Sequence, residues 1–195
     1  MYSGSNPSAL RSREWIRTSL MQLLETQKYS QITIKDICKN ADLSRQTFYQ
    51  IFKSKDEVMQ YHFSILFQEF AEECDSFRNI DISKISYNFF NFFYIHKEFI
   101  DILISNNLTY FLEQQFEIYL NKIDFFIIRN NDSYSDYTTA YVSGALTQIL
   151  IHWFKKDFNL DIKILSKLTE NIITGQVFKI EKNKKEMICI IIKSP

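Results

Sequence analysis

Residues 33–55, which read TIKDICKNADLSRQTFYQIFKSK, predict two short helices joined by a tight turn and followed at once by a third helix. Thr33 and Asp36 have the spacing of a capping pair, and apolar residues then recur at helical intervals. Ser44 is a favourable N-cap for the second helix, which ends near Phe52. Two helices that cross over a short turn form a helix-turn-helix, whose second helix fits the major groove of DNA. We therefore expect DNA as the first partner.

The composition predicts an all-α fold. Of the 195 residues, 46% are hydrophobic and 16% aromatic, whereas Gly and Pro number only three and two. With so few residues that interrupt helices, long helices can run unbroken. The net charge is zero, but residues 1–63 carry nine Lys and Arg against six Asp and Glu, so the basic excess coincides with the helix-turn-helix. This is the distribution that binding to a nucleic acid requires.

The cysteines and the apolar runs bear on location and cofactors. Cys38, Cys74 and Cys189 lie far apart and lack the spacing of a metal site, which is typical of a reduced cytoplasmic protein. The N-terminus lacks the apolar run of a signal peptide, and no segment has the roughly 18 apolar residues of a membrane span. We expect a cytoplasmic protein with no metal, no cofactor and no membrane contact.

Helical periodicity extends along most of the chain. It predicts a first helix over residues 10–26, with Trp15 on its apolar face, and a fourth from residue 55 to about 77. Further helices are expected over residues 82–94, 96–105, 107–129, 135–156 and 161–183. Residues 1–8 are expected to fray, and 130–133 to form a polar loop. The tail 186–195, with its apolar run MICIII, fits a strand, a helix extension or a sticky end, and its role stays open.

A family pattern covers residues 12–60. It comprises an apolar first helix, a run in which Tyr29, Thr33, Asp36 and Ser44 keep their spacing, and the stretch TFYQIFKSK, all without a gap. In this pattern the segment resembles the N-terminal domain of the TetR/AcrR-type transcriptional regulators. The resemblance implies a three-helix DNA-binding domain, residues 1–54, followed by a helical ligand-binding and dimerisation domain, residues 55–195.

The chain departs from the family pattern in three places. Asp42 occupies the position of the turn glycine, and Asp tolerates the left-handed backbone less well than Gly does. Ile51 replaces an aromatic residue or His that touches phosphate, so we expect that contact to be lost. Arg45 and Gln46 replace the usual Lys/Arg-Gly pair, which adds a long polar side chain at the groove.

The leading turn of the second short helix carries the predicted base contacts. Arg45 can donate two hydrogen bonds to guanine, and Gln46 can pair with adenine. The hydroxyl of Tyr49 suits a phosphate oxygen, and helix N-termini attract phosphate through their free N–H groups. The alternative is that these side chains are merely solvated. The predicted DNA-binding residues are Thr33, Lys35, Ser44, Arg45, Gln46, Thr47, Tyr49 and Lys55.

The second domain is expected to bind an effector and a second copy of the chain. The resemblance implies a small effector, hydrophobic or aromatic, although an aromatic stripe is more often part of the core than of a pocket. The candidate pocket residues are Phe89, Phe93, His96, Phe99, Phe111, Phe116, Tyr119 and Trp153. Apolar stripes on the last two long helices predict an isologous four-helix contact. Its candidate residues are Tyr141, Ala145, Leu146, Ile149, Trp153, Ile164, Leu168 and Ile172.

These features predict a sequence-specific transcriptional regulator, with repression as the first expectation, that binds a palindromic operator as a homodimer and responds to a small-molecule effector. The alternative is a helical adaptor, or an activator of the same fold that a protein partner controls. We expect no enzymatic activity, because the three His lie outside any metal motif and no Gly-rich phosphate loop or nucleophile elbow occurs.

Overall fold

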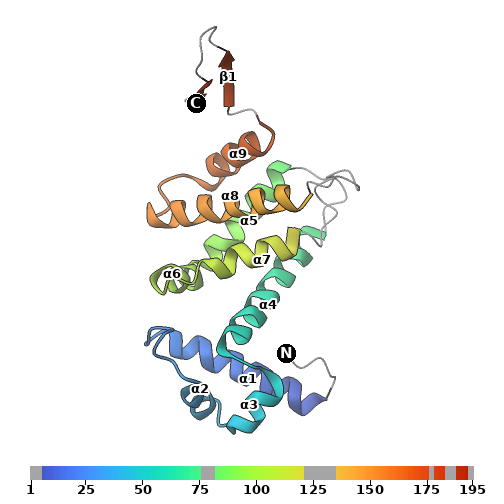
Figure 1. Ribbon diagram of the computed structural model, residues 1–195, viewed down its shortest axis with the longest axis vertical. Coiled ribbons are helices and arrows are strands. Elements are labelled where there is room, and N and C mark those ends of the chain that lie inside the picture. Colours follow the sequence, from blue (N-terminus) through green and yellow to red (C-terminus); the bar gives the residue numbers. More distant parts are fainter. Residues whose placement is uncertain (1–5, 76–81, 121–134, 176–177, 183–187, 193–195) are drawn as a thin grey trace.

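The computed structural model describes residues 6–75, 82–120, 135–175, 178–182 and 188–192. These residues form a stack of helices that ends in a short pair of strands (Figure 1). The helices are α1 (Pro7–Leu24), α2 (Ile34–Asn40), α3 (Arg45–Ile51), α4 (Lys55–Asp75), α5 (Ile82–Ile95), α6 (Lys97–Ser105), α7 (Tyr110–Leu120), α8 (Ser135–Lys155) and α9 (Ile162–Ile173). The predicted all-helical architecture is confirmed, with the two strands as an addition at its C-terminal end.

The first three helices form a small unit at one end of the molecule (Figure 1). The prediction that residues 1–8 fray is wrong for Pro7 and Ser8, because α1 begins at Pro7 and Asn6 caps it by accepting a hydrogen bond from the Ser8 N–H at 3.0 Å. Proline at the first helical position sacrifices no helical hydrogen bond. Trp15 is 53% exposed, so its predicted place on the buried face is wrong, whereas Ile16 is fully buried.

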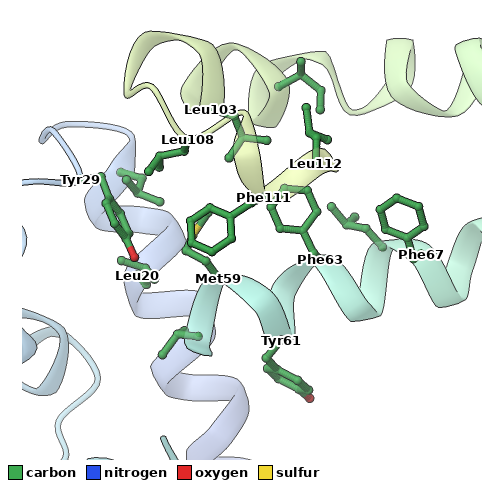
Figure 2. Packing of buried hydrophobic residues seen from close by; sticks show 14 of the residues in the cluster. Leu20, Tyr29, Met59, Tyr61, Phe63, Phe67, Leu103, Leu108, Phe111 and Leu112 are labelled. Atoms are coloured by element: carbon green, nitrogen blue, oxygen red, sulfur yellow. The ribbon is translucent and has the colours of Figure 1, made fainter. Parts of the chain in front are cut away.

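Helix α4 connects this unit to the rest of the chain. Its buried side chains face α1 near its beginning and α7 further along, where the rings of Phe63 and Phe111 lie 6.1 Å apart (Figure 2). Met59 and Phe63 are both fully buried. The two ends of the molecule therefore share one continuous core rather than two separate ones.

Beyond α4, helices pack in layers: α7 lies against α4 and α8, and α5 lies against α9 (Figure 1). Helices α5, α6 and α8 match the predicted ranges to within two residues. The helix predicted over residues 107–129 begins only at Tyr110, because Asn107 has a left-handed backbone with φ of 58°. The end of that prediction and the polar loop at 130–133 lie outside the described residues.

The predicted helix over residues 161–183 is wrong in its second half. Helix α9 ends at Ile173, and Gly175, with φ of 72°, turns the chain away as glycine commonly does after a helix. Strand β1 (Phe178–Lys182) then pairs antiparallel with β2 (Ile188–Ile192), Phe178 opposite Ile192. The β-branched isoleucines favour strand over helix. Of the three alternatives for the tail, residues 188–192 thus adopt the strand. Among the described helices, none has both the length and the apolarity to span a membrane.

Candidate DNA-binding interface

The start of α2 is held by a reciprocal pair of hydrogen bonds. The Asp36 N–H donates to Oγ1 of Thr33 at 3.2 Å, and the Thr33 N–H donates to Oδ2 of Asp36 at 2.9 Å. These contacts lower the pKa of the Asp36 carboxyl, chiefly through the hydrogen bond from Thr33. The predicted capping pair is therefore confirmed. Thr33 and Lys35 are exposed at this end of the helix.

The turn between α2 and α3 has the left-handed residue that the sequence predicts. Asp42 has φ of 52°, and the Leu43 N–H donates to the carbonyl of Cys38 at 2.9 Å, which closes the end of α2. Ser19 of α1 adds a hydrogen bond to the Ile37 carbonyl at 2.8 Å. These contacts hold the turn and fix the angle at which α3 leaves α2.

Helix α3 has one buried and one exposed face. Ser44 caps it, because Oγ of Ser44 accepts the Thr47 N–H at 3.0 Å. Phe48 is fully buried and Ile51 is 3% exposed, whereas Arg45 and Gln46 are exposed. Phe48 and Ile51 therefore lie on the buried face, and its burial removes Ile51 from any contact with phosphate.

Tyr49 completes the exposed face. It is 50% exposed, and its ring packs edge-on against Phe48, with ring centroids 5.6 Å apart. The aromatic contact supports the ring, and half of the residue remains exposed to solvent. Gln50, which the sequence analysis does not single out, is also exposed, one turn beyond Gln46. Its i, i+4 spacing from Gln46 is the signal that could have identified it.

Lys55 lies at the start of α4, but its ammonium is turned inward. Nζ donates to the carbonyls of Tyr29 and Ile32, the latter at 2.9 Å, and lies 4.2 Å from the centroid of the Tyr29 ring. Burial lowers the pKa of this ammonium. The side chain therefore fastens the loop between α1 and α2 to α4, a role that no local sequence pattern reveals.

Most of the candidate pocket residues lie in the core of the second half. Phe89, Phe93, Phe111, Phe116 and Trp153 are at most 6% exposed, and Tyr119 packs against the rings of Phe67 and Phe70. His96 and Phe99 instead line an open groove beside α1. The eight candidates are thus divided between a packed core and a surface groove.

The candidate dimer residues all come from α8 and α9, and all but Trp153 line a hollow on these helices or are exposed. Tyr141, Ala145, Leu146, Ile149 and Ile172 line an apolar hollow of about 180 Å³. Next to it, Ile164 and Leu168 are 59% and 39% exposed. Trp153 is the exception, because it is 3% exposed and its indole N–H donates to the Leu160 carbonyl.

The helix-turn-helix segment is similar to segments of known proteins. Residues 16–61 match the family described as bacterial regulatory proteins, tetR family. Over 125 residues, 63% of each protein, the chain is 27% identical to the dhaKLM operon transcriptional activator DhaS of Lactococcus lactis. Over 55 residues, 28% of the chain and 25% of the relative, it is 38% identical to the transcriptional regulator EthR of Mycolicibacterium smegmatis. In both cases the match covers less than two thirds of the relative.

Solved structures share the fold over most of the chain. A TetR transcriptional regulator from Streptococcus agalactiae superposes with a TM-score of 0.61 at 17% identity, covering 85% of this chain and 95% of that one. The dihydroxyacetone kinase operon activator DhaS superposes with a TM-score of 0.53 at 19% identity, covering 86% and 96%. The helix-turn-helix of residues 16–61 is thus similar to the DNA-binding segment of the tetR family of bacterial regulatory proteins, and the described helices share the fold of solved TetR-type structures.

Proposed function

We propose that the chain binds a palindromic operator as a homodimer and that the exposed face of α3 reads the base sequence. The observation that carries this proposal is the division of α3, which buries Phe48 and leaves Arg45 and Gln46 exposed at its leading end. Residues at that end of a recognition helix reach base edges, where Arg pairs with guanine and Gln with adenine. Tyr49, Thr33, Lys35 and Thr47 flank this end and contact the backbone, and Ser44 fixes the start of the helix.

Lys55 has a different role in the proposal. Its ammonium is already bonded to two carbonyls, so it positions the loop that precedes Thr33 rather than binding bases. The N–H groups at the start of α2, next to Thr33, then point at the phosphate backbone. Replacing Lys55 would loosen this end and weaken binding to all DNA sequences alike.

Two copies are needed because one recognition helix reads only a few base pairs. The apolar hollow between α8 and α9, with the exposed Ile164 and Leu168, supports an isologous contact between these helices. Such a dimer presents two α3 helices to half-sites about 34–36 Å apart. We accordingly place the DNA-binding domain at residues 1–54 and the effector and dimerisation domain at residues 55–195.

The direction of regulation distinguishes two candidates. Repression is our first, with an effector that releases the operator. Activation by the same fold, under the control of a protein partner, is the second candidate. The relative DhaS, which is an operon activator, supports it. A reporter gene behind the operator separates them, because deletion of the regulator raises expression under repression and lowers it under activation.

A gel-shift titration with DNA from upstream of the protein's own gene tests operator binding. We expect a shift that weakens steeply between 50 and 200 mM salt, because each phosphate contact releases counterions. Arg45→Ala and Gln46→Ala should relax sequence preference, each by a factor equivalent to about 1–3 kcal/mol. Lys55→Ala should weaken all sequences equally, and Lys163→Ala on α9 is the matched control. Equal losses on every sequence in all three variants would refute the division of roles.

A further inference from the structure

An open groove of about 850 Å³ lies where α1 meets the second half of the molecule. One wall comes from α1 and α4, and the other from α6 and the end of α8, with α6 lying near the C-terminal half of α1 (Figure 1). Its apolar surface includes Met21, Leu66, Phe99, Phe154 and Phe158. The volume lies within the range of small-molecule sites.

Negative side chains outnumber positive ones around this groove. Four carboxylates line it, those of Glu25, Glu98, Asp101 and Asp157, and all four residues are exposed. Of the two permanent cations, Arg17 is paired with Glu14 at 2.9 Å, and Lys97 lies over the Tyr94 ring at 5.4 Å. Lys155 and Lys156, although close in sequence, do not line the groove. The lining therefore carries an excess of negative charge that its own cations do not neutralise.

We propose that this groove is an effector site for an amphipathic organic cation, in which an aromatic or aliphatic body covers the apolar surface and the positive group faces the carboxylates. Phe99, Phe154 and Phe158 supply aromatic surface to the lining, and aromatic rings attract cations as well as apolar groups. Binding of the cation does not depend on the proposed function; only its consequence, regulation of operator binding, rests on it.

The groove is connected to the DNA-binding helices by direct contacts. Nη1 of Arg17 donates to Nδ1 of His62 at 3.0 Å, and the His62 ring packs edge-on against Phe99, with centroids 4.5 Å apart. Oδ1 of Asn106, at the end of α6, accepts the Tyr29 N–H at 2.7 Å. Because α6 forms one wall and Asn106 bonds the loop before α2, an occupant that shifts α6 also shifts the support of the reading helices. The ligand acts by its unequal affinity for the two arrangements.

Isothermal titration calorimetry with a pair of ions of equal shape tests the site. Tetraphenylphosphonium should bind the full-length protein, and the similarly shaped anion tetraphenylborate should not. Glu98→Gln combined with Asp101→Asn should raise the dissociation constant of the cation at least about fivefold, because two of the four carboxylates are removed. Glu117→Gln, an exposed carboxylate of α7 outside the groove, is the matched control. Equal binding of both ions, or binding that the double variant leaves unchanged, overturns the proposal.

The connection is tested by operator binding with and without tetraphenylphosphonium. The cation should change operator affinity at least about fivefold in the wild type. Asn106→Ala should bind the cation with unchanged affinity but lose this response, and Asn106→Asp, which keeps the acceptor oxygen, should retain it. A response that survives in Asn106→Ala refutes the route through α6. Calorimetry tests the effector site without DNA, and the gel shift without the cation tests operator binding alone. Failure of the effector site and failure of the proposed function are therefore distinguishable.

Discussion

The DNA-binding helices and the helices of the second half are held together by different forces. In the first region polar side chains fix the ends of short helices: Thr33 caps α2, Ser44 caps α3, and Lys55 fastens the loop between α1 and α2. In the second region the rings of Phe89, Phe93 and neighbouring aromatics pack against one another at 4.9–6.2 Å. Directional bonds suit a surface that must present side chains at set positions, whereas aromatic packing stabilises without specifying one arrangement as strictly.

The largest expected effect comes from removing a ring of the aromatic core. Phe93 is 1% exposed and contacts Phe89, Phe92 and Phe116. Phe93→Ala should lower the free energy of unfolding by about 3–5 kcal/mol, since it removes buried apolar area and leaves a cavity. Urea denaturation followed by circular dichroism measures this. The exposed Gln114→Ala on α7 should change it by less than about 0.5 kcal/mol. A loss for Phe93→Ala no larger than this control would contradict the assigned role of aromatic packing.

A smaller effect is expected from pH at the boundary of the two regions. Burial lowers the pKa of His62 from 6.5 to about 4. The charges of Arg17 and His96 add to this lowering, and that of Glu14 opposes it. Between these values the unfolded chain binds the proton and the folded chain does not, so stability rises as pH rises through this window and is lost as pH falls. The free energy of unfolding should decrease by about 2 kcal/mol from pH 7 to pH 5 because of His62.

Urea titrations at the two pH values, made on His62→Gln and on the wild type, isolate this contribution. The variant should lose most of the decrease, whereas His152→Gln, which replaces an exposed histidine, should keep it. Parallel pH profiles for the wild type and His62→Gln would show that the boundary is not the site of the proton uptake.

The smallest effect is expected in the turn of the helix-turn-helix. Asp42 has φ of 52°, a conformation that glycine adopts without strain and other residues do not. Asp42→Gly should raise the free energy of unfolding by up to about 1 kcal/mol, measured as a shift in the urea midpoint. Asp42→Ala should lower it, because Ala lacks the local hydrogen bonding by which Asp tolerates this conformation. A gain for Ala equal to that for Gly would mean that the backbone at this turn is not strained.

The same contrast explains which features the sequence could predict. The caps at Thr33 and Ser44 and the left-handed Asp42 depend on residues within a few positions of one another, so local patterns reveal them. The bond from Tyr29 to Asn106 joins residues 77 positions apart, and the groove at Phe99 and Phe158 needs α1, α4, α6 and the end of α8 to meet. No local pattern encodes such contacts. Helix period alone also misplaced Trp15 and extended α9 through Gly175 into a strand.

The inward ammonium of Lys55 also sets a limit on how the chain can be divided. A fragment that stopped at residue 54 would leave the carbonyls of Tyr29 and Ile32 without their donor, and would remove the Asn106 acceptor of the Tyr29 N–H. Helices α2 and α3 thus depend for part of their support on residues of α4 and of the end of α6. Grafting them onto an unrelated sensor would call for at least the first turn of α4 and a substitute for the end of α6.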